Sequence, residues 1–118
     1  MLKKLIASVA VMASAGIGLG AAASPAAASP CPSGMLCAYL YTNYVGDPGT
    51  VEFNNTNLLQ YNKFNNAVSV SNSGRDCSVR IYSGTGYTGS SVVIPRGYGI
   101  GNLAGTAYYK NVASNRWC

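Results

Sequence analysis

The hydrophobic residues between position 31 and the C-terminus fall in short runs that alternate with turn-forming residues. Four of these runs are "GTVEFNN", "NAVSVSN", "CSVRIYSG" and "SSVVIPRG", which combine β-branched or aromatic residues with flanking glycine, asparagine, serine or proline. Such runs are typical of β-strands joined by tight turns, and no stretch has the period of an amphipathic helix. Several short strands at even spacing predict an all-β sandwich or barrel.

The first 28 residues have the pattern of a secretory signal peptide. Two lysines near the start precede an uncharged apolar run, and small residues follow in two copies of "AAASP". Cleavage could follow Ala23 or Ala28, and we favour Ala28, which leaves a single secreted, extracellular domain over residues 29–118. The alternative is a membrane anchor, but the apolar run is short for a span, so we expect no membrane segment after cleavage.

Two spacings recur along the chain. "YLYTNYVG" begins at Tyr39 and "YSGTGYTG" begins 43 residues later, and both read Tyr, four residues, Tyr, one residue, Gly. "FNNAVSV" (64–70) and "YKNVASN" (109–115) lie 45 residues apart and share an aromatic residue, an Asn and a Ser. The repeat predicts two Greek-key motifs of similar size, at about 37–73 and 77–118.

Each part of the repeat has a physical interpretation. Gly46 and Gly89 can adopt a positive φ, so the chain can fold back sharply after a strand. The tyrosine two residues earlier can then cover the folded hairpin with its ring. The Asn-x-x-Ser segments have short side chains that hydrogen-bond nearby backbone. Leu58 and Leu103 occupy equivalent positions, and we expect both between the two sheets.

All four cysteines lie in the predicted mature domain, and an even number in a small exported chain indicates disulfides. Of the three possible pairings, we predict Cys31 with Cys37, which closes the short loop "CPSGMLC". The remaining pair, Cys77 with Cys118, would tie the C-terminus to the middle of the chain.

The charged residues limit the possible functions. The predicted signal peptide contains two of the eight Lys and Arg residues and none of the three acidic ones, which leaves a net charge of +3. The basic residues are scattered, which argues against a nucleic-acid partner. The chain has no histidine, so it has neither a Ser-His pair nor a histidine-based metal site. We therefore expect a protein that is not an enzyme.

The doubled Tyr-x4-Tyr-x-Gly pattern with its Asn-x-x-Ser loops resembles the βγ-crystallin fold, a sandwich of two four-stranded Greek-key motifs. The fuller pattern, with "CPSGMLCAY", "FNNAVSV" and "NVASNRWC", is similar to peptidase inhibitor family 36, an exported actinobacterial family. Its type member is a microbial metalloproteinase inhibitor. The resemblance covers nearly all of residues 31–118.

This resemblance implies a secreted protease inhibitor that fills the cleft of a metalloprotease with a rigid loop. We expect the protein to be a monomer. One candidate loop links the two motifs and contains Gly74, Arg75, Asp76, Cys77 and Ser78. The other is the disulfide loop, which could offer Met35 and Leu36 to an apolar pocket. The alternative is that Met35 and Leu36 begin the first strand and pack inward.

Microbial βγ-crystallins bind calcium through the half-site N/D-N/D-x-x-S/T-S, so the Asn-x-x-Ser loops are calcium candidates. The matching residues are Asn65, Asn66 and Ser69 in the first loop and Asn111 and Ser114 in the second. Neither loop has a carboxylate, and Lys110 puts a positive charge in the second. We therefore expect no cofactor, with calcium at most weakly bound. The other functions considered are a cell-surface binding or structural module and a small toxin.

Overall fold

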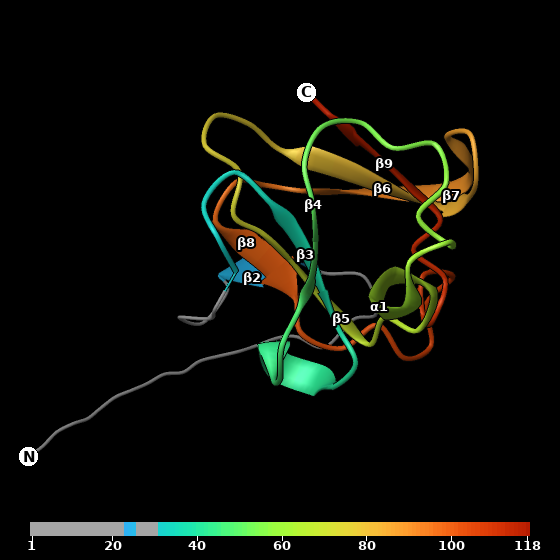
Figure 1. The fold of residues 1–118 in the computed structure, drawn as a ribbon, viewed down its shortest axis with the longest axis horizontal. Helices are drawn as coiled ribbons and strands as arrows, with labels where there is room; N and C mark the ends of the chain where they lie inside the picture. The colour runs from blue at the N-terminus through green and yellow to red at the C-terminus, as the bar shows by residue number, and fades with distance from the viewer. Residues whose placement is uncertain (1–22, 26–30) are drawn as a thin grey trace, which may run out of the picture.

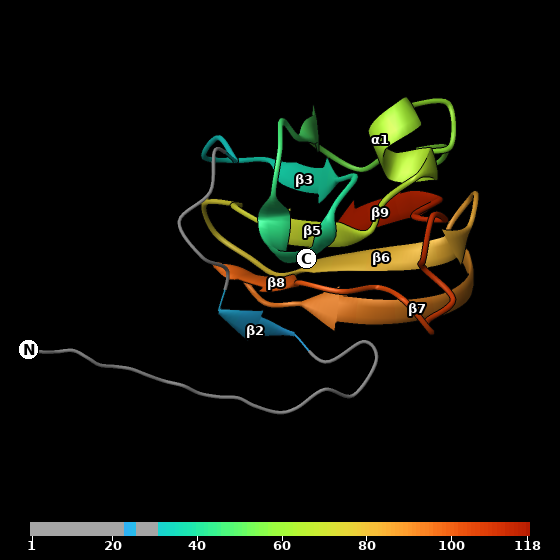
Figure 2. The ribbon, with the colours of Figure 1, turned by 90° about the horizontal axis from the view of Figure 1, so that it is seen from below.

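The strands of the protein form two antiparallel sheets that pack against each other (Figure 1 and Figure 2). The computed structural model describes residues 23–25 and 31–118. The larger sheet has the order β2 (Ser24–Pro25), β8 (Tyr98–Ile100), β5 (Ser69–Asn72), β3 (Leu36–Tyr39) and β4 (Gly49–Val51). The smaller has the order β7 (Thr88–Ile94), β6 (Val79–Gly84) and β9 (Ser114–Trp117). A short helix, α1 (Asn62–Asn65), and a turn of 3₁₀ helix, η2 (Thr42–Tyr44), lie in the loops. The predicted all-β class and βγ-crystallin-like sandwich are confirmed.

Each half of the chain contributes a segment to the sheet of the other half. Strand β8 comes from the second half but pairs with β5 of the first, with Val70 opposite Ile100. In return, Asn55 of the first half forms an isolated bridge with Asn115 on β9. Because Val70 and Asn115 are equivalent positions of the repeat, the exchange is reciprocal. In the described residues the first copy has only this bridge where the second copy has a full strand.

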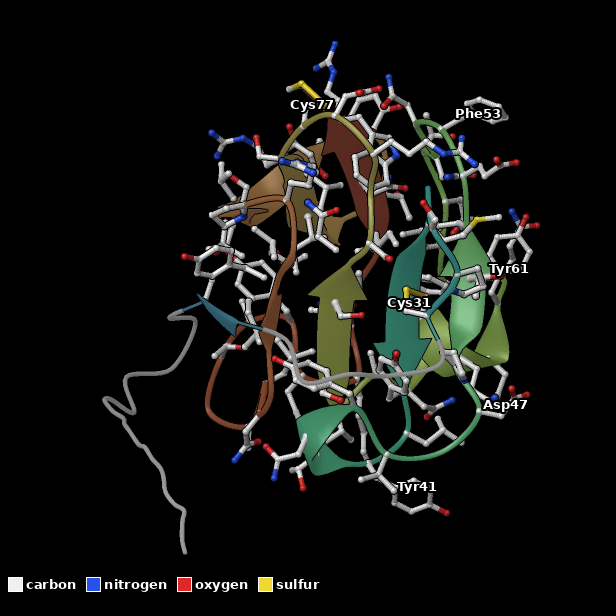
Figure 3. The ribbon with its side chains drawn as sticks, turned by 90° about the vertical axis from the view of Figure 1, so that its left-hand side faces the viewer. Cys31, Tyr41, Asp47, Phe53, Tyr61 and Cys77 are labelled. Atoms are coloured by element: carbon white, nitrogen blue, oxygen red, sulfur yellow. A yellow bond between two sulfur atoms is a disulfide. The ribbon has the colours of Figure 1, made fainter. Side chains whose placement is uncertain are left out.

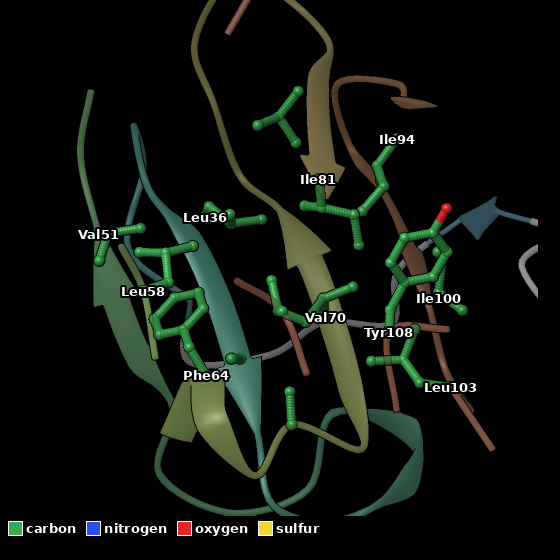
Figure 4. Packing of buried hydrophobic residues seen from close by; sticks show 14 residues of the cluster. Leu36, Val51, Leu58, Phe64, Val70, Ile81, Ile94, Ile100, Leu103 and Tyr108 are labelled. Carbon is green, nitrogen blue, oxygen red and sulfur yellow. The ribbon is translucent and has the colours of Figure 1, made fainter. Parts of the chain in front are cut away.

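The space between the sheets is filled mainly by aliphatic side chains, together with the rings of Phe64 and Tyr108 (Figure 4). On β6, Val79 and Ile81 are buried while Arg80 between them is exposed, as the alternation of a half-buried strand requires. Leu58 and Leu103 are both fully buried in this core, as predicted from the repeat. The outer face of β3 is covered too, because Cys37 and Tyr39 pack with Tyr44 and Met35 in a second cluster; the remaining member is Cys31.

The two tyrosine hairpins have the same form. The rings of Tyr39 and Tyr44 lie 5.8 Å apart between centroids, and those of Tyr82 and Tyr87 lie 5.5 Å apart. Tyr44 and Tyr87 adopt positive φ angles of 60° and 64°, and the glycine two residues later does so as well. The repeated spacing therefore encodes a hairpin in which the second tyrosine and the glycine both have left-handed backbone angles. The ring of the second tyrosine packs on the ring of the first.

The structure contains both disulfides with the predicted pairing. Cys31 joins Cys37 across a Cα–Cα distance of 5.9 Å, and Cys77 joins Cys118 across 5.7 Å. The first closes the loop before β3, and the second fixes the C-terminus to the start of β6. Native disulfides in small domains typically contribute about 2 to 5 kcal/mol each to stability.

Most of the predicted signal peptide lies outside the described residues. Its described part, residues 23–25, includes β2, which pairs with β8 at the edge of the larger sheet. Cleavage after Ala28 would remove β2 and leave β8 as the edge strand. None of the helices among the described residues is long and apolar enough to cross a membrane.

Candidate functional site

Several loops and the C-terminus meet at one end of the sandwich, which we call the linker end. It consists of residues 32–35, 52–54, 74–78 and 117–118. A cavity of about 360 Å³ lies among them and is lined by parts of all four segments. Figure 3 shows Cys77 and Phe53 at this end, with Tyr41 and Asp47 at the other. The linker end therefore contains the linker-loop residues that the sequence singles out.

The linker between β5 and β6 forms an arch held by one buried side chain. Asn72 is 1% exposed, and its Oδ1 accepts a hydrogen bond of 2.7 Å from the backbone N–H of Gly74. Its Nδ2 donates to the carbonyl oxygens of Cys77 (3.2 Å) and Ile94 (2.9 Å). The amide of Asn72 thus bridges the two ends of the arch. Arg75 and Asp76 lie between these ends and are exposed.

The remaining linker residues are fixed by the C-terminus. A Cβ atom added to Gly74 would lie 2.5 Å from the ring of Trp117, so a side chain has no room there. Cys77 is held by its disulfide, and the carbonyl of Ser78 accepts a hydrogen bond of 3.1 Å from the N–H of Cys118. The five predicted linker residues therefore lie together on a firmly anchored loop.

The disulfide loop supports the linker rather than presenting apolar side chains to solvent. Leu36 begins β3 and is fully buried, which is the inward alternative considered above. Met35 is half-buried against the cluster around Tyr39. The N–H of Gly34 donates to the carbonyl of Ser73 (2.7 Å), whose N–H donates to the carbonyl of Met35 (2.9 Å). Leu36 is thus unavailable to a partner, because the first strand needs it in the core.

Asn72, which holds the arch, and Phe53, which lies at the linker end, are not among the sequence-based candidate residues. Asn72 ends the strand-like run "NAVSVSN", although an Asn beside a turn is a recognised signal for side-chain bonds to the backbone. The run "GTVEFNN" predicts a strand at Phe53, because an aromatic residue between polar ones is typical of a strand. The structure places Phe53 on a turn after β4 with 76% of its surface exposed.

The repeated serines close the two tyrosine hairpins. The hydroxyl of Ser69 donates to the carbonyl of Tyr41 (2.7 Å) and accepts from the N–H of Tyr44 (3.1 Å). The hydroxyl of Ser114 makes the same bonds at the same lengths to Gly84 and Tyr87. Both serines are fully buried. This pair of hydrogen bonds explains why the serine recurs at the same position of both repeats.

The asparagines of the same loops also bond to protein groups. Asn66 Nδ2 donates to the backbone and side-chain oxygens of Asn62, both at 3.0 Å. Asn111 Nδ2 donates to the carbonyls of Ser83 (2.9 Å) and Ala107 (3.1 Å). Asn65 is exposed. Across residues 23–25 and 31–118, no group of three or more His, Cys, Asp or Glu residues could hold a metal ion. That these loops bind calcium at most weakly stays a prediction.

The charged groups of residues 31–118 are mostly exposed. Glu52 and Asp76 both line the cavity of the linker end, beside Arg75, while Lys63 and Asp47 form an ion pair of 3.9 Å elsewhere on the surface. Burial raises the pKa of the Tyr108 phenol above its ordinary value, and the nearby positive charge of Arg80 partly offsets this effect.

The fold and the linker end define a small, disulfide-linked β-sandwich with an anchored loop at one end. The sequence profile of peptidase inhibitor family I36 matches residues 24–94, which is more than half of the chain. The protein therefore belongs to peptidase inhibitor family I36, a family of inhibitors rather than enzymes. The match includes the disulfide loop, the Phe53 turn and the linker. No curated protein sequence matches the chain.

Solved structures with a similar fold include βγ-crystallins. A domain from work on the evolution of the eye-lens βγ-crystallin fold matches with a TM-score of 0.64 at 15% identity. The match covers 84% of this chain and 97% of that domain's chain. IPSE/alpha-1 from Schistosoma mansoni eggs has a TM-score of 0.61 at 18% identity, with 74% and 87% covered. A βγ-crystallin from Ciona intestinalis has a TM-score of 0.57 at 16% identity, with 72% and 100% covered. At these identities the likeness shows the fold alone.

Proposed function

We propose that the protein is a secreted inhibitor of a metalloprotease and that it blocks the protease cleft with the linker arch, residues 74–78. Membership of a peptidase inhibitor family supports a protease as the partner. We propose a metalloprotease as the target because the type member of the family is a metalloproteinase inhibitor. The two disulfides and the predicted signal peptide support an extracellular site of action.

The anchoring of the arch is the observation that carries this proposal. An inhibitory loop gains affinity when it is already ordered, because binding then costs little conformational entropy. Here the Asn72 amide bridges the ends of the arch, and the disulfide of Cys77 fixes its far side. Arg75 and Asp76 between them are exposed and able to contact a partner.

The test is a titration of the purified secreted protein against metallo-, serine and cysteine proteases. We expect competitive inhibition of a metalloprotease by one molecule of inhibitor per enzyme. Replacing Arg75 and Asp76 together by alanine should weaken inhibition by about tenfold or more, as loss of central contacts does at tight interfaces.

A matched control removes the same charges elsewhere. The pair Lys63 and Asp47 also consists of one basic and one acidic residue, and its ion pair lies away from the linker end. The Lys63→Ala/Asp47→Ala variant should inhibit like the wild type. If both double variants inhibited as strongly as the wild type, the arch would not be the contact. If the wild type inhibited no protease, the inhibitor function would be refuted.

A further inference from the structure

Phe53 combines exposure with an unfavourable backbone conformation. Its surface is 76% exposed, although most phenylalanines in small domains are buried. Its φ is +60°, a region that residues with a bulky side chain rarely adopt because Cβ crowds the following carbonyl. A glycine would suit this backbone better, and a polar residue would suit this exposure better. Stability of the isolated fold therefore does not explain a phenylalanine here.

The turn that presents Phe53 is held firmly. The carbonyl oxygen of Phe53 accepts three hydrogen bonds, from Trp117 Nε1 (2.9 Å), Asn115 Nδ2 (3.0 Å) and Asn55 Nδ2 (3.1 Å). Next to it, Asn54 Oδ1 accepts from the N–H of Trp117 (2.8 Å). Both residues of β9 that donate here come from the other half of the chain. The surrounding structure thus fixes a strained backbone and projects the ring outward.

The repeat provides an internal comparison. The position equivalent to Phe53 in the second half is Tyr98, which begins the regular strand β8 and is 40% exposed. In the first half the corresponding segment pairs with β9 only through the bridge at Asn55, and Phe53 lies outside any strand. The two halves agree at the hairpin tyrosines and the serines but differ here. The departure puts an aromatic ring in solvent where its counterpart lies on a sheet.

Phe53 also shares a surface with the proposed inhibitory arch. The cavity of about 360 Å³ is lined by Phe53 together with Arg75, Asp76 and Trp117. Figure 3 shows Phe53 and Cys77 at the same end of the molecule. A protease that receives the arch in its cleft would therefore lie within reach of the ring.

We infer that Phe53 is a second anchor of the inhibitor, which inserts its ring into an apolar pocket of the protease beside the cleft and so determines which proteases are bound. This inference rests on the proposed inhibitory function. A rigidly held aromatic ring buries a large apolar area on binding and loses little entropy, which is the usual character of an interface hot spot. The strained turn is retained because it directs the ring at the partner.

The test measures the inhibition constant of three variants against a protease that the wild type inhibits. Phe53→Ala should weaken inhibition by about 30-fold or more, as truncation of a buried aromatic anchor does. Phe53→Leu, which keeps an apolar side chain, should recover most of the loss. Tyr41→Ala is the matched control, because Tyr41 is also an aromatic residue, 61% exposed, but lies at the opposite end. It should inhibit like the wild type.

A fourth variant separates strain from binding. Phe53→Gly should melt about 4 to 8 °C higher than Phe53→Ala, because glycine adopts the positive φ without strain. It should nevertheless inhibit as weakly as Phe53→Ala. Because the ring lies mostly in solvent, we expect all of these variants to fold. A Phe53→Gly variant that melts no lower than the wild type but inhibits more weakly than the wild type would show that the ring serves binding and not the fold.

The outcomes distinguish this inference from the proposed function. If the wild type inhibits a protease and Phe53→Ala inhibits it equally well, the anchor is refuted and the arch alone remains. If Tyr41→Ala weakens inhibition as much as Phe53→Ala, the linker end is not the specific contact and the anchor is refuted too. If the wild type inhibits no protease, the proposed function fails first and the anchor fails with it.

Discussion

Replacing Ser69 by alanine removes a fully buried hydroxyl that is bonded on both sides. The hydroxyl donates to the carbonyl of Tyr41 at 2.7 Å and accepts from the N–H of Tyr44 at 3.1 Å. Alanine cannot make either bond, and a buried polar group that loses its partner costs about 1 to 3 kcal/mol. With two backbone groups affected, we expect the free energy of unfolding to fall by about 2 to 4 kcal/mol.

Thermal unfolding followed by circular dichroism measures this loss. For a domain of this size, each kcal/mol corresponds to about 4 to 8 °C in Tm, so Ser69→Ala should melt at least about 8 °C below the wild type. Ser114→Ala should show a similar loss, since its hydroxyl makes the equivalent bonds at the same lengths.

Ser71 on the same strand provides the control. It is 2% exposed, and its hydroxyl has no hydrogen-bond partner in the described structure. Ser71→Ala should therefore leave Tm unchanged or raise it slightly. If Ser69→Ala and Ser71→Ala melted at the same temperature, the two hairpin bonds would contribute nothing, and the structural explanation of the repeated serine would be wrong.

Three further predictions concern the glycines, alkaline pH and calcium. Gly89→Ala should lower Tm more than Gly105→Ala. Both glycines have a positive φ, but of the two only Gly89 has another atom close to the position of an added Cβ, at 2.5 Å, and equal losses of Tm would contradict this. Because burial raises the pKa of Tyr108, the phenol of Tyr108 loses its proton at a lower pH in the unfolded chain than in the folded protein. The free energy of unfolding should therefore fall as the pH rises above about 10, and Tyr108→Phe should reduce this fall. Millimolar calcium should raise the stability by no more than about 0.4 kcal/mol if its dissociation constant is near that concentration. A Tm rise of many degrees that Asn66→Ala abolished would show that the loops form a true calcium site.

The repeat made much of the fold predictable from the sequence. The spacing of Tyr39 and Tyr44 and its copy 43 residues later depend on local backbone geometry, so one sequence suffices to predict two equal hairpins. The disulfides could be predicted as well, because the short loop between Cys31 and Cys37 favours that pair, which leaves only Cys77 with Cys118. Local constraints of this kind are visible in the order of the residues.

Features that depend on contacts between the halves were not predictable in this way. The position of the strand containing Tyr98 beside the first half, and the reduction of its counterpart to one bridge at Asn55, are set by tertiary packing. The composition around Phe53 predicts a strand, whereas donors from the distant strand β9 hold this residue in a turn. The sequence leaves open whether Leu36 faces a partner or packs inward, because its burial depends on the opposing sheet.

Competition at the active site tests the central claim most directly. A secreted metalloprotease is titrated with the purified protein at increasing concentrations of a small inhibitor that occupies the active site. If the linker end fills the cleft, the apparent dissociation constant should rise in proportion to the concentration of the small inhibitor, with one protein bound per enzyme. An apparent dissociation constant that did not change with the small inhibitor, or no binding to any protease, would contradict the account.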